Sequence, residues 1–282
     1  MPDFAARFSV EATRPSAAEI ETMAGILPSG TEVYITAVPK LTTEELVAAA
    51  AHLRRAGLEP VVHIAARMLP SVQSLTDLLS RLHVEAKVRR LLVIGGDAPQ
   101  AGPFADALAL IQKGHLREAG IEEIGIGAYP EGHPSIPAGR LEAALDEKIA
   151  AATAQGLAVN IVSQFCFSPE RIVAWLRQLR ACGIDRPVKV GMVGPTSVTG
   201  LMRFARRCGV ATSLRGLVSG SAASLVGHVG PERILDALAV ADEIGDAAPH
   251  YFSFGGAVET ARYACAAAER TRAARHAMAN PD

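Results

Sequence analysis

The stretch "TTEELVAAAAHLRRAG" (residues 42–57) is followed at once by "EPVVHIA" (59–65), and together they show the pattern that repeats along the chain. In the first segment Leu46, Leu53 and two of the alanines between them share one face at helical spacing, and Gly57 supplies a stop signal. The second segment is short and rich in valine and isoleucine, as a buried strand is. The two segments therefore predict a helix that leads directly into a strand.

Strand-like runs of this kind occur eight times, separated by stretches with helical spacing that are rich in alanine, leucine and charged residues. The runs are "FSVEAT" (8–13), "TEVYITA" (31–37), "EPVVHIA" (59–65), "RLLVIGG" (90–96), "EIGIGA" (123–128), "LAVNIVSQ" (157–164), "PVKVGMVG" (187–194) and "HYFSFGG" (250–256). Parallel neighbours cannot be joined by a hairpin, so this alternation predicts parallel strands with crossover helices. Eight such units in about 250 residues match the size of a (β/α)8 barrel. We therefore predict an α/β fold, a single-domain (β/α)8 TIM barrel over residues 1–282.

A doubly wound open sheet is the alternative to a barrel. That fold usually carries a glycine-rich fingerprint directly after its first strand, and "FSVEATRPS" (8–16) has none. The least regular segment, "SLRGLVSGSAASLVGHVGPE" (213–232), is rich in glycine and serine and too long for an ordinary connection. We expect it to form a mobile loop near the active site.

The composition narrows the possible partners. Lys plus Arg number 28 and Asp plus Glu number 29, so the formal net charge is −1, which favours neither a nucleic acid nor an anionic membrane as partner. The start of the chain, "MPDFAARFSVEATRP", lacks a long apolar segment before a cleavage site, so no secretory signal is expected. The four cysteines stand far apart, with no C-x-x-C motif and no histidine at metal spacing. We expect reduced cysteines, no metal site and a cytoplasmic location.

A barrel places its chemistry at the carboxyl ends of its strands. Polar residues stand at that position in most of the predicted units, and they include Glu11, Thr36, His63, Asp97 and Gln164. The two glycines just before Asp97, Gly95 and Gly96, would let backbone amides come close to a ligand. We therefore expect these residues to gather at one rim of the barrel.

The segment "AYPEGHP" (128–134) follows the fifth predicted strand. Its two prolines and one glycine forbid a regular helix or a central strand. Stiffening of this kind would hold Tyr129 and His133 in place, which is what a loop that orients a ligand contributes. We interpret the segment as one wall of an active site.

These segments, taken in order, resemble a known family. "SVEATRP", "YIT", "VVHIA", "GGDAP", "AYPEGHP", "LDEKI", "VSQFCF" and "VGMVGPTS" look like methylenetetrahydrofolate reductase over roughly residues 8–260. The most specific pieces are A-Y-P-E-G-H-P and S-Q-F-x-F, whose order and spacing carry more weight than either motif alone. The family folds as a (β/α)8 barrel, usually with FAD, and moves a hydride from a nicotinamide to methylenetetrahydrofolate.

The resemblance implies roles for individual residues. It implies Glu11 as the general acid and Asp97 as the carboxylate that faces the flavin and the folate. It implies Gln164, together with Phe165, as a contact of the folate's pterin ring. The residues implied to bind the flavin are Thr36, His63, Gly95, Gly96, Asp97, Tyr129, His133 and Lys148, the last near its phosphates.

The chain departs from the family's pattern mainly on the cofactor side. Gly95, Glu147 and Gly256 each stand where an arginine is expected. The first strand continues as "ATRP" (12–15) rather than with aromatic residues and a double proline. Charge-assisted hydrogen bonds are the strong ones, so the loss of cations predicts weaker binding of an anionic cofactor such as FAD.

Other interpretations of the same residues stay open. Glu11 could lie on a solvated edge, His63 could be a core histidine, and Asp97 could cap the next helix. Lys148 could be an ordinary solvated lysine, and Lys189 could be the Schiff-base lysine of a lyase. A pterin-binding methyltransferase and a non-catalytic barrel subunit are further alternatives.

The function we predict is that of an oxidoreductase that interconverts 5,10-methylenetetrahydrofolate and 5-methyltetrahydrofolate with NADH or NADPH, through FAD. The sequence does not fix the direction, since reduction feeds methionine synthesis and oxidation would serve growth on methyl groups. A tetrahydrofolate derivative is the expected partner, and we expect a homo-oligomer.

Overall fold

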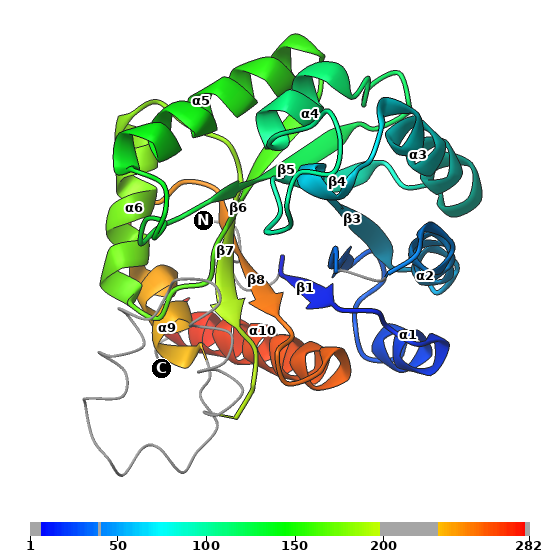
Figure 1. The fold of residues 1–282 in the computed structure, drawn as a ribbon. Helices are drawn as coiled ribbons and strands as arrows, with labels where there is room; N and C mark the ends of the chain where they lie inside the picture. Colours follow the sequence, from blue (N-terminus) through cyan, green and yellow to red (C-terminus); the bar gives the residue numbers. More distant parts are fainter. Residues whose placement is uncertain (1–6, 39–40, 198–230, 280–282) are drawn as a thin grey trace.

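The computed structural model describes residues 7–38, 41–197 and 231–279, with side chains as far as residue 273. Eight parallel strands close into a barrel in the order β1 to β8, and β8 pairs with β1. Figure 1 shows the strands at the centre and the helices as an outer ring. The strands are β1 (Ser9–Ala12), β2 (Glu32–Ile35), β3 (Glu59–Ala65), β4 (Arg90–Ile94), β5 (Glu123–Ala128), β6 (Ala158–Ser163), β7 (Val188–Val193) and β8 (Ala247–Phe252). The predicted (β/α)8 TIM barrel is confirmed.

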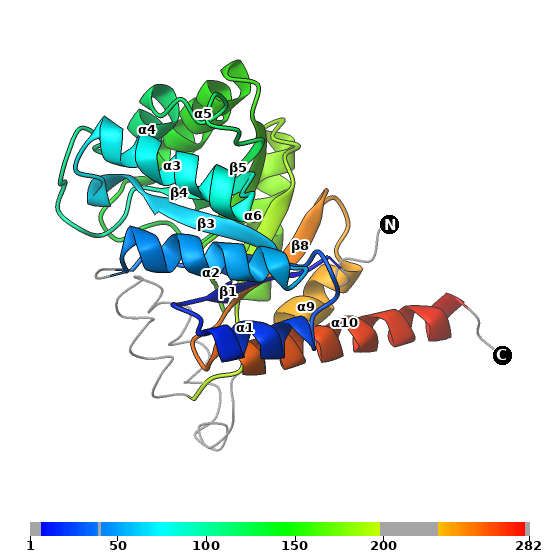
Figure 2. The same cartoon turned by 90° about the vertical axis from the view of Figure 1, so that its right-hand side faces the viewer.

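Helices surround the strands. They are α1 (Ala17–Ala24), α2 (Thr43–Arg55), the 3-10 helix η2 (Ala66–Met68), α3 (Val72–Ala86), α4 (Ala107–Lys113), α5 (Ala138–Ala154), α6 (Pro169–Ala181), α9 (Glu232–Val240) and α10 (Ala257–Ala279). Helix α10 extends past the other helices (Figure 2). None of the helices in the described ranges combines the length and the apolar character needed to cross a bilayer. The segment 213–232, expected as a mobile loop, lies outside the described residues apart from its last two.

Helix α2 shows how the sequence pattern becomes structure. The Thr42 hydroxyl accepts a hydrogen bond from Glu45 N at 3.2 Å, and the Glu45 carboxylate accepts one from Thr42 N at 2.9 Å, so the two residues cap the helix start. Leu46 and Leu53 are buried in the core between helix and strands. Gly57 takes a φ of +81°, which ends the helix and turns the chain into β3. The expected helix and strand are both confirmed.

The eighth strand begins earlier than its sequence pattern indicates. The pattern suggests residues 250–256, whereas β8 covers Ala247–Phe252. It pairs with β7 along its whole length. Its first three residues, two alanines and a proline, are poor strand formers, so the closure of the barrel rather than local propensity makes them part of a strand. The correction moves His250 from the start of the strand to its middle.

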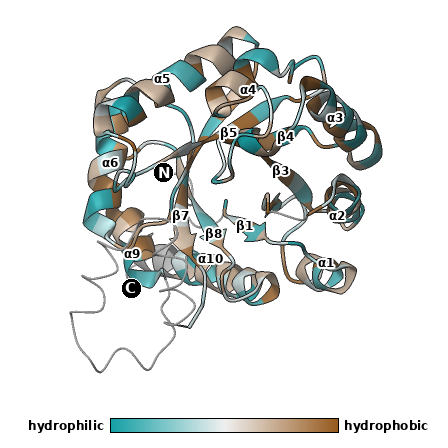
Figure 3. Ribbon diagram, in the orientation of Figure 1, coloured by the Kyte–Doolittle hydropathy of each residue, from teal (hydrophilic) through white to brown (hydrophobic). Residues whose placement is uncertain are grey.

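The barrel axis is filled in three levels. Alternate strand residues face the helices and form the large core, and hydrophobic colour runs along β3 and β7 in Figure 3. At the middle of the axis four side chains pack on one another: Tyr34, Val61, Leu92 and Val162. Charged side chains precede this layer along the strands, and the polar residues predicted for the site follow it. The apolar layer therefore separates two polar ends.

Candidate active site

Glu11 lies at the centre of a buried polar group towards the carboxyl ends of the strands. Its side chain is 8% exposed, and its Oε1 lies 3.6 Å from His63 Nε2 and 3.4 Å from His250 Nε2. Thr36 hydrogen-bonds to the same carboxyl, and Thr13 Oγ1 donates to Thr36 Oγ1 at 3.2 Å. The alternative of a solvated edge for Glu11 is therefore wrong. The structure brings three predicted residues together and adds His250.

Burial sets the protonation states of this group. It raises the pKa of Glu11 to about 7, although His63 and the hydrogen bond to Thr36 act in the opposite direction. Burial also lowers the pKa of His63 to about 4 and that of His250 to about 3, and Lys189 adds to the effect at His250. Near pH 7 both imidazoles are therefore neutral, and Glu11 is the group that exchanges a proton.

Asp97 follows β4 on the same rim. Its side chain is exposed and makes no hydrogen bond or ion pair with another residue in the described ranges. Helix α4 is capped by Asp106 instead, whose Oδ1 accepts a hydrogen bond from Ala109 N at 2.8 Å. The alternative in which Asp97 caps the next helix is therefore wrong, and its carboxylate is open to a ligand.

The glycines before Asp97 allow close packing of the backbone. Gly96 takes a φ of +84°, and a Cβ at this position would lie 3.1 Å from Ala65 Cβ. Arg67 holds the loop, since its Nη1 donates to Gly96 O at 3.2 Å and its Nε donates to Ala105 O at 2.8 Å. Gly95 is packed less closely, because a Cβ added at this position would lie 4.0 Å from its nearest neighbour, Asp106 Cα.

The segment "AYPEGHP" forms a tight turn after β5. Gly132 N donates to Tyr129 O at 3.1 Å, and Gly132 takes a φ of +78°. The rings of Tyr129 and His133 meet edge to face with their centroids 5.1 Å apart, and His133 Nδ1 accepts a hydrogen bond from Ser135 N at 3.2 Å. The expected stiff turn is present, and it holds both rings at the rim.

The glutamate of this turn has a structural contact. The Glu131 side chain is 7% exposed, and its Oε1 lies 3.7 Å from Arg171 Nε in α6. Cys166 lies beside it, and burial raises the pKa of that thiol to about 12. Cys166 is therefore a packing residue at neutral pH, and Glu131 anchors the turn to α6.

Gln164 and Phe165 directly follow β6. Gln164 Oε1 accepts a hydrogen bond from Phe165 N at 3.0 Å, which leaves the amide NH2 group to donate elsewhere. Phe165 is 1% exposed, and its ring packs edge-on against Phe167, Phe252 and Phe254 with centroids 5.2 to 5.7 Å apart. Gln164 is thus placed to offer a donor at the rim, and Phe165 supports the wall behind it.

Lys148 reaches from α5 to the end of β5. Its Nζ donates to Gly127 O at 2.9 Å, and burial lowers its pKa to about 8, opposed by the charge of Asp106. The alternative of an ordinary solvated lysine is therefore wrong. The neighbouring Glu147 forms an ion pair with Arg140 at 2.9 Å, so it adds no positive charge near Lys148.

These contacts decide how well a flavin fits. Gly125 faces the apolar layer on the axis, so strand alternation puts Gly127 on the same face, where an added Cβ would meet nothing within 4 Å. His63 Nε2 is buried without a hydrogen-bond partner among the described residues. Open space at Gly127 and a hydrogen-bonding nitrogen without a partner at His63 are both features that suit a planar polar ring. The phosphates fit less well, because Lys148 already donates to a carbonyl and the family's arginines are absent beside it.

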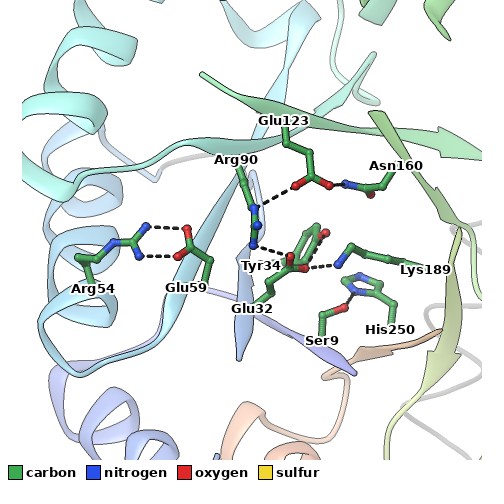
Figure 4. Close-up of polar contacts among 10 residues, drawn as sticks. All are labelled: Ser9, Glu32, Tyr34, Arg54, Glu59, Arg90, Glu123, Asn160, Lys189 and His250. Atoms are coloured by element: carbon green, nitrogen blue, oxygen red, sulfur yellow. Dashed lines mark hydrogen bonds and ion pairs between the residues drawn. The ribbon is translucent and has the colours of Figure 1, made fainter. Parts of the chain in front are cut away.

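The amino-terminal end of the barrel is closed by a charged group that we call the barrel-floor cluster (Figure 4). Arg90 Nη1 donates to Glu32 Oε1 at 2.9 Å, and Arg90 Nε lies 3.0 Å from Glu123 Oε2. Asn160 Nδ2 donates to Glu123 Oε1 at 2.7 Å, and Lys189 pairs with Glu32 Oε2. The members of the cluster are Glu32, Arg90, Glu123, Asn160 and Lys189, and the Tyr34 hydroxyl donates to Glu32 Oε2 at 3.4 Å from the neighbouring apolar layer.

The place of Lys189 argues against a Schiff-base lyase. Lys189 is the second residue of β7, so it lies at the opposite end of the strands from the rim. A Schiff base needs an uncharged amine that a carbonyl substrate can reach. The Lys189 amine already pairs with Glu32, and its Nζ lies 5.6 Å from the centroid of the Tyr34 ring. The geometry therefore disfavours this alternative.

His250 and the members of the barrel-floor cluster other than Lys189 could not be singled out from the sequence. Once β8 is known to start at Ala247, alternation places His250 on the same face as Phe252. The cluster has a weaker signal, which is the recurrence of a charged residue at the start of a strand, as at Glu32, Arg90 and Glu123. In the sequence alone such residues resemble solvent-exposed residues at the ends of strands, and only the closed barrel brings them together.

Comparison with known proteins identifies relatives over much of the chain. The family model described as methylenetetrahydrofolate reductase matches residues 9–213. A curated 5,10-methylenetetrahydrofolate reductase of Pectobacterium carotovorum subsp. carotovorum is 28% identical over 152 residues, which are 54% of this chain and 49% of that protein. Methylenetetrahydrofolate reductase 2 of Saccharomyces cerevisiae is 25% identical over 158 residues, which are 53% of this chain and 26% of that protein. The chain thus matches about half the length of one curated relative and about a quarter of the other.

Among solved structures, the dihydropteroate synthase of Thermus thermophilus has a similar fold. It superposes with a TM-score of 0.51 at 16% identity, and the match covers 94% of this chain and 93% of that chain. At this identity the likeness concerns the fold alone.

Proposed function

The chain belongs to the methylenetetrahydrofolate reductase family, and from this premise we propose that it is an oxidoreductase that interconverts 5,10-methylenetetrahydrofolate and 5-methyltetrahydrofolate. NADH or NADPH would give or take the hydride. The observation that carries the proposal is the buried Glu11 carboxyl, whose pKa is raised to about 7. Such a group is partly protonated at neutral pH, so it can give a proton in reduction and take one back in oxidation.

Reduction of the folate needs one proton and one hydride. The carbon–nitrogen bond of the five-membered ring breaks as the nitrogen takes the proton, and the methylene carbon is left as a cationic iminium that the hydride converts to methyl. A nitrogen anion is a poor leaving group, so the proton has to arrive as the bond breaks. We assign this step to Glu11, which lies inside the barrel towards the rim. The Gln164 amide would hydrogen-bond the pterin ring, whose edge presents paired donors and acceptors.

A folate assay with identified products tests this function directly. The protein is supplied with methylenetetrahydrofolate and NADH or NADPH, and the folate product is identified by mass spectrometry. We expect 5-methyltetrahydrofolate to form in equal amount to the nicotinamide oxidised. Folate binding without any transfer of hydride would instead support the methyltransferase or the non-catalytic alternative.

FAD, when bound, would carry the hydride between nicotinamide and folate. We propose that its ring lies in the space beside Gly127, with Thr36 and the unpaired His63 Nε2 facing it. Tyr129 and His133 would border it from the turn after β5. Further predicted contacts are Gly95, Gly96 and Asp97 after β4, with Lys148 near the phosphates.

We expect FAD to bind weakly, because the ring has a suitable space while the phosphates meet few free cations. Saturating FAD should raise the thermal stability, by about 2.7 kcal/mol at a hundredfold excess over Kd. Riboflavin, which lacks the phosphates, should bind almost as tightly if the ring dominates. If saturating FAD changes neither the melting temperature nor the rate, the flavin proposal is wrong and the hydride passes directly from the nicotinamide.

Asp97 is expected to stabilise the iminium cation, because its carboxylate is exposed at the rim without a partner in the described ranges. An opposite charge near a protein surface is worth roughly 1 to 4 kcal/mol, so Asp97→Asn should slow folate reduction by about tenfold or more. Oxidation of the nicotinamide by an artificial acceptor should be unchanged. Asp77→Asn, on the exposed face of α3, is the matched control. Equal losses in both reactions would mark Asp97 as structural.

A further inference from the structure

We propose that His250, held by Ser9, is a positioning residue that donates its Nε2–H to one oxygen of the Glu11 carboxyl. Ser9 and His250 stand directly opposite each other where β1 pairs with β8. Ser9 Oγ lies 2.8 Å from His250 Nδ1, and Figure 4 marks this contact with a dashed line. His250 Nε2 lies 3.4 Å from Glu11 Oε1. The role rests on the proposed function of Glu11, but the hydrogen bonds do not.

Ser9 decides which nitrogen of His250 carries the proton. Ser9 is buried, and within the described ranges its hydroxyl has a side-chain hydrogen bond to His250 alone. If Nδ1 carried the proton, the Ser9 O–H would be a buried donor without an acceptor, which is costly. Nδ1 therefore accepts the hydrogen bond, and the single proton of the neutral imidazole lies on Nε2, towards Glu11.

Aromatic packing fixes the plane of the His250 ring. Its centroid lies 4.5 Å from that of Tyr34 and 5.3 Å from that of Phe252, both edge to face. The other imidazole near Glu11 is a poorer candidate for the donor, because His63 Nε2 lies 3.6 Å from Glu11 Oε1 and forms no hydrogen bond with a described residue. His250 is therefore the better-held of the two.

His250 is neutral, so its N–H acts on the Glu11 carboxyl as a dipole and not as a charge, and the charged and titratable groups around it can be named. Glu32 and Tyr34 face it from β2, Lys189 faces it from β7, and His63 lies across Glu11 on β3. Lys189 and Glu32 form an ion pair and act on the pKa of His250 in opposite directions, with Lys189 having the larger effect. A donated N–H favours the ionised carboxylate and opposes burial. It also holds Oε1 of the Glu11 carboxyl in place.

Titration of Glu11 tests this inference without any need for activity. The intact protein is labelled with 13C at the glutamate carboxyls, Glu11 is assigned from the spectrum of Glu11→Gln, and its shift is followed between about pH 5 and pH 9. His250→Phe keeps an aromatic ring and removes the donor, so the midpoint of Glu11 should rise by about one pH unit. Ser9→Ala removes the hydrogen bond that fixes the tautomer of His250, so it should raise the Glu11 midpoint by a smaller amount. His250→Gln restores an N–H donor and should return the midpoint towards the parent value.

The control is His52→Gln, which changes a histidine paired with Glu21 at the surface and should leave the midpoint unchanged. Near-UV circular dichroism shows which variants are folded. If His250→Phe does not fold, the Glu11 midpoint in Ser9→Ala still tests the inference. An unchanged or lower midpoint in the folded variants overturns the inference, and so does an equal rise in His250→Gln and His250→Phe. Absence of folate reduction in the parent would overturn the proposed function and leave this titration to stand by itself.

Discussion

Glu11→Gln is expected to lower the rate of folate reduction by about 10²-fold or more, which is the usual loss when a general acid is removed. Glutamine keeps the shape of the side chain and has no carboxyl proton to give. The hydrogen-bonded setting of Thr36 and His250 is kept, because an amide oxygen can still accept their hydrogen bonds. Oxidation of the nicotinamide by an artificial acceptor needs no such proton, so that rate should survive. Single-turnover measurements of the two reactions separate these effects.

Glu122→Gln is the matched control, because Glu122 is an exposed glutamate that pairs with Arg89. It should leave both reactions unchanged. A Glu11→Gln variant that reduces methylenetetrahydrofolate at near the parent rate would remove Glu11 from the mechanism. In the parent, the rate of reduction should fall as the pH rises through about 7, where Glu11 loses its proton.

Stability provides a second readout of the same substitution, with a sign that follows from the raised pKa. The folded protein holds the Glu11 proton up to about pH 7, whereas the unfolded chain releases it near 4.5. Folding is therefore penalised progressively as the pH rises from about 4.5 to about 7, by on the order of 3 kcal/mol above that range. Glu11→Gln removes this penalty, so it should lower the rate while making the free energy of unfolding less dependent on pH. A purely structural residue would show the opposite combination of intact rate and lost stability.

Much of the fold could be predicted because its signals are local. Helix α2 is predicted by its cap at Thr42, its apolar face and Gly57, and similar signals predict the other strand–helix units. The start of β8 could not be predicted, because the closure of the barrel imposes a strand on two alanines and a proline. Propensity is a property of the segment, whereas this pairing is a property of the whole barrel.

The candidate site divides in the same way. Strand ends place Glu11 and His63 on one rim, so their closeness follows from the predicted architecture. The part played by His250 depends on its register against Ser9, which no local pattern gives. Glu131 shows the converse case, since its carboxyl belongs to a residue type suited to proton transfer but contacts Arg171 and anchors a turn. Residue type suggests chemistry, but only the neighbours decide whether a side chain is used for it.

The barrel-floor cluster leads to the second large effect, which is on stability. Glu32 receives Arg90 on Oε1 and Lys189 on Oε2, and the Glu32 and Lys189 side chains are each only 16% exposed. Glu32→Gln keeps the volume and removes the negative charge, so Lys189 is left facing a neutral amide while Arg90 keeps its ion pair with Glu123. Removing one partner of a buried ion pair usually costs about 3–5 kcal/mol, because the remaining charge is desolvated without compensation. We expect a loss of this size in the free energy of unfolding.

Urea denaturation of Glu32→Gln and Glu147→Gln side by side measures this loss against a matched control. Both substitutions neutralise a glutamate that pairs with an arginine, but Glu147 and Arg140 are 43% and 50% exposed. Water solvates an exposed pair, so Glu147→Gln should change the stability by no more than about 1 kcal/mol. The difference between the two variants therefore isolates what burial adds to an ion pair in this barrel. If both variants lose the same small amount, Glu123 is sufficient for Arg90, water reaches Lys189, and the barrel floor is an ordinary solvated surface.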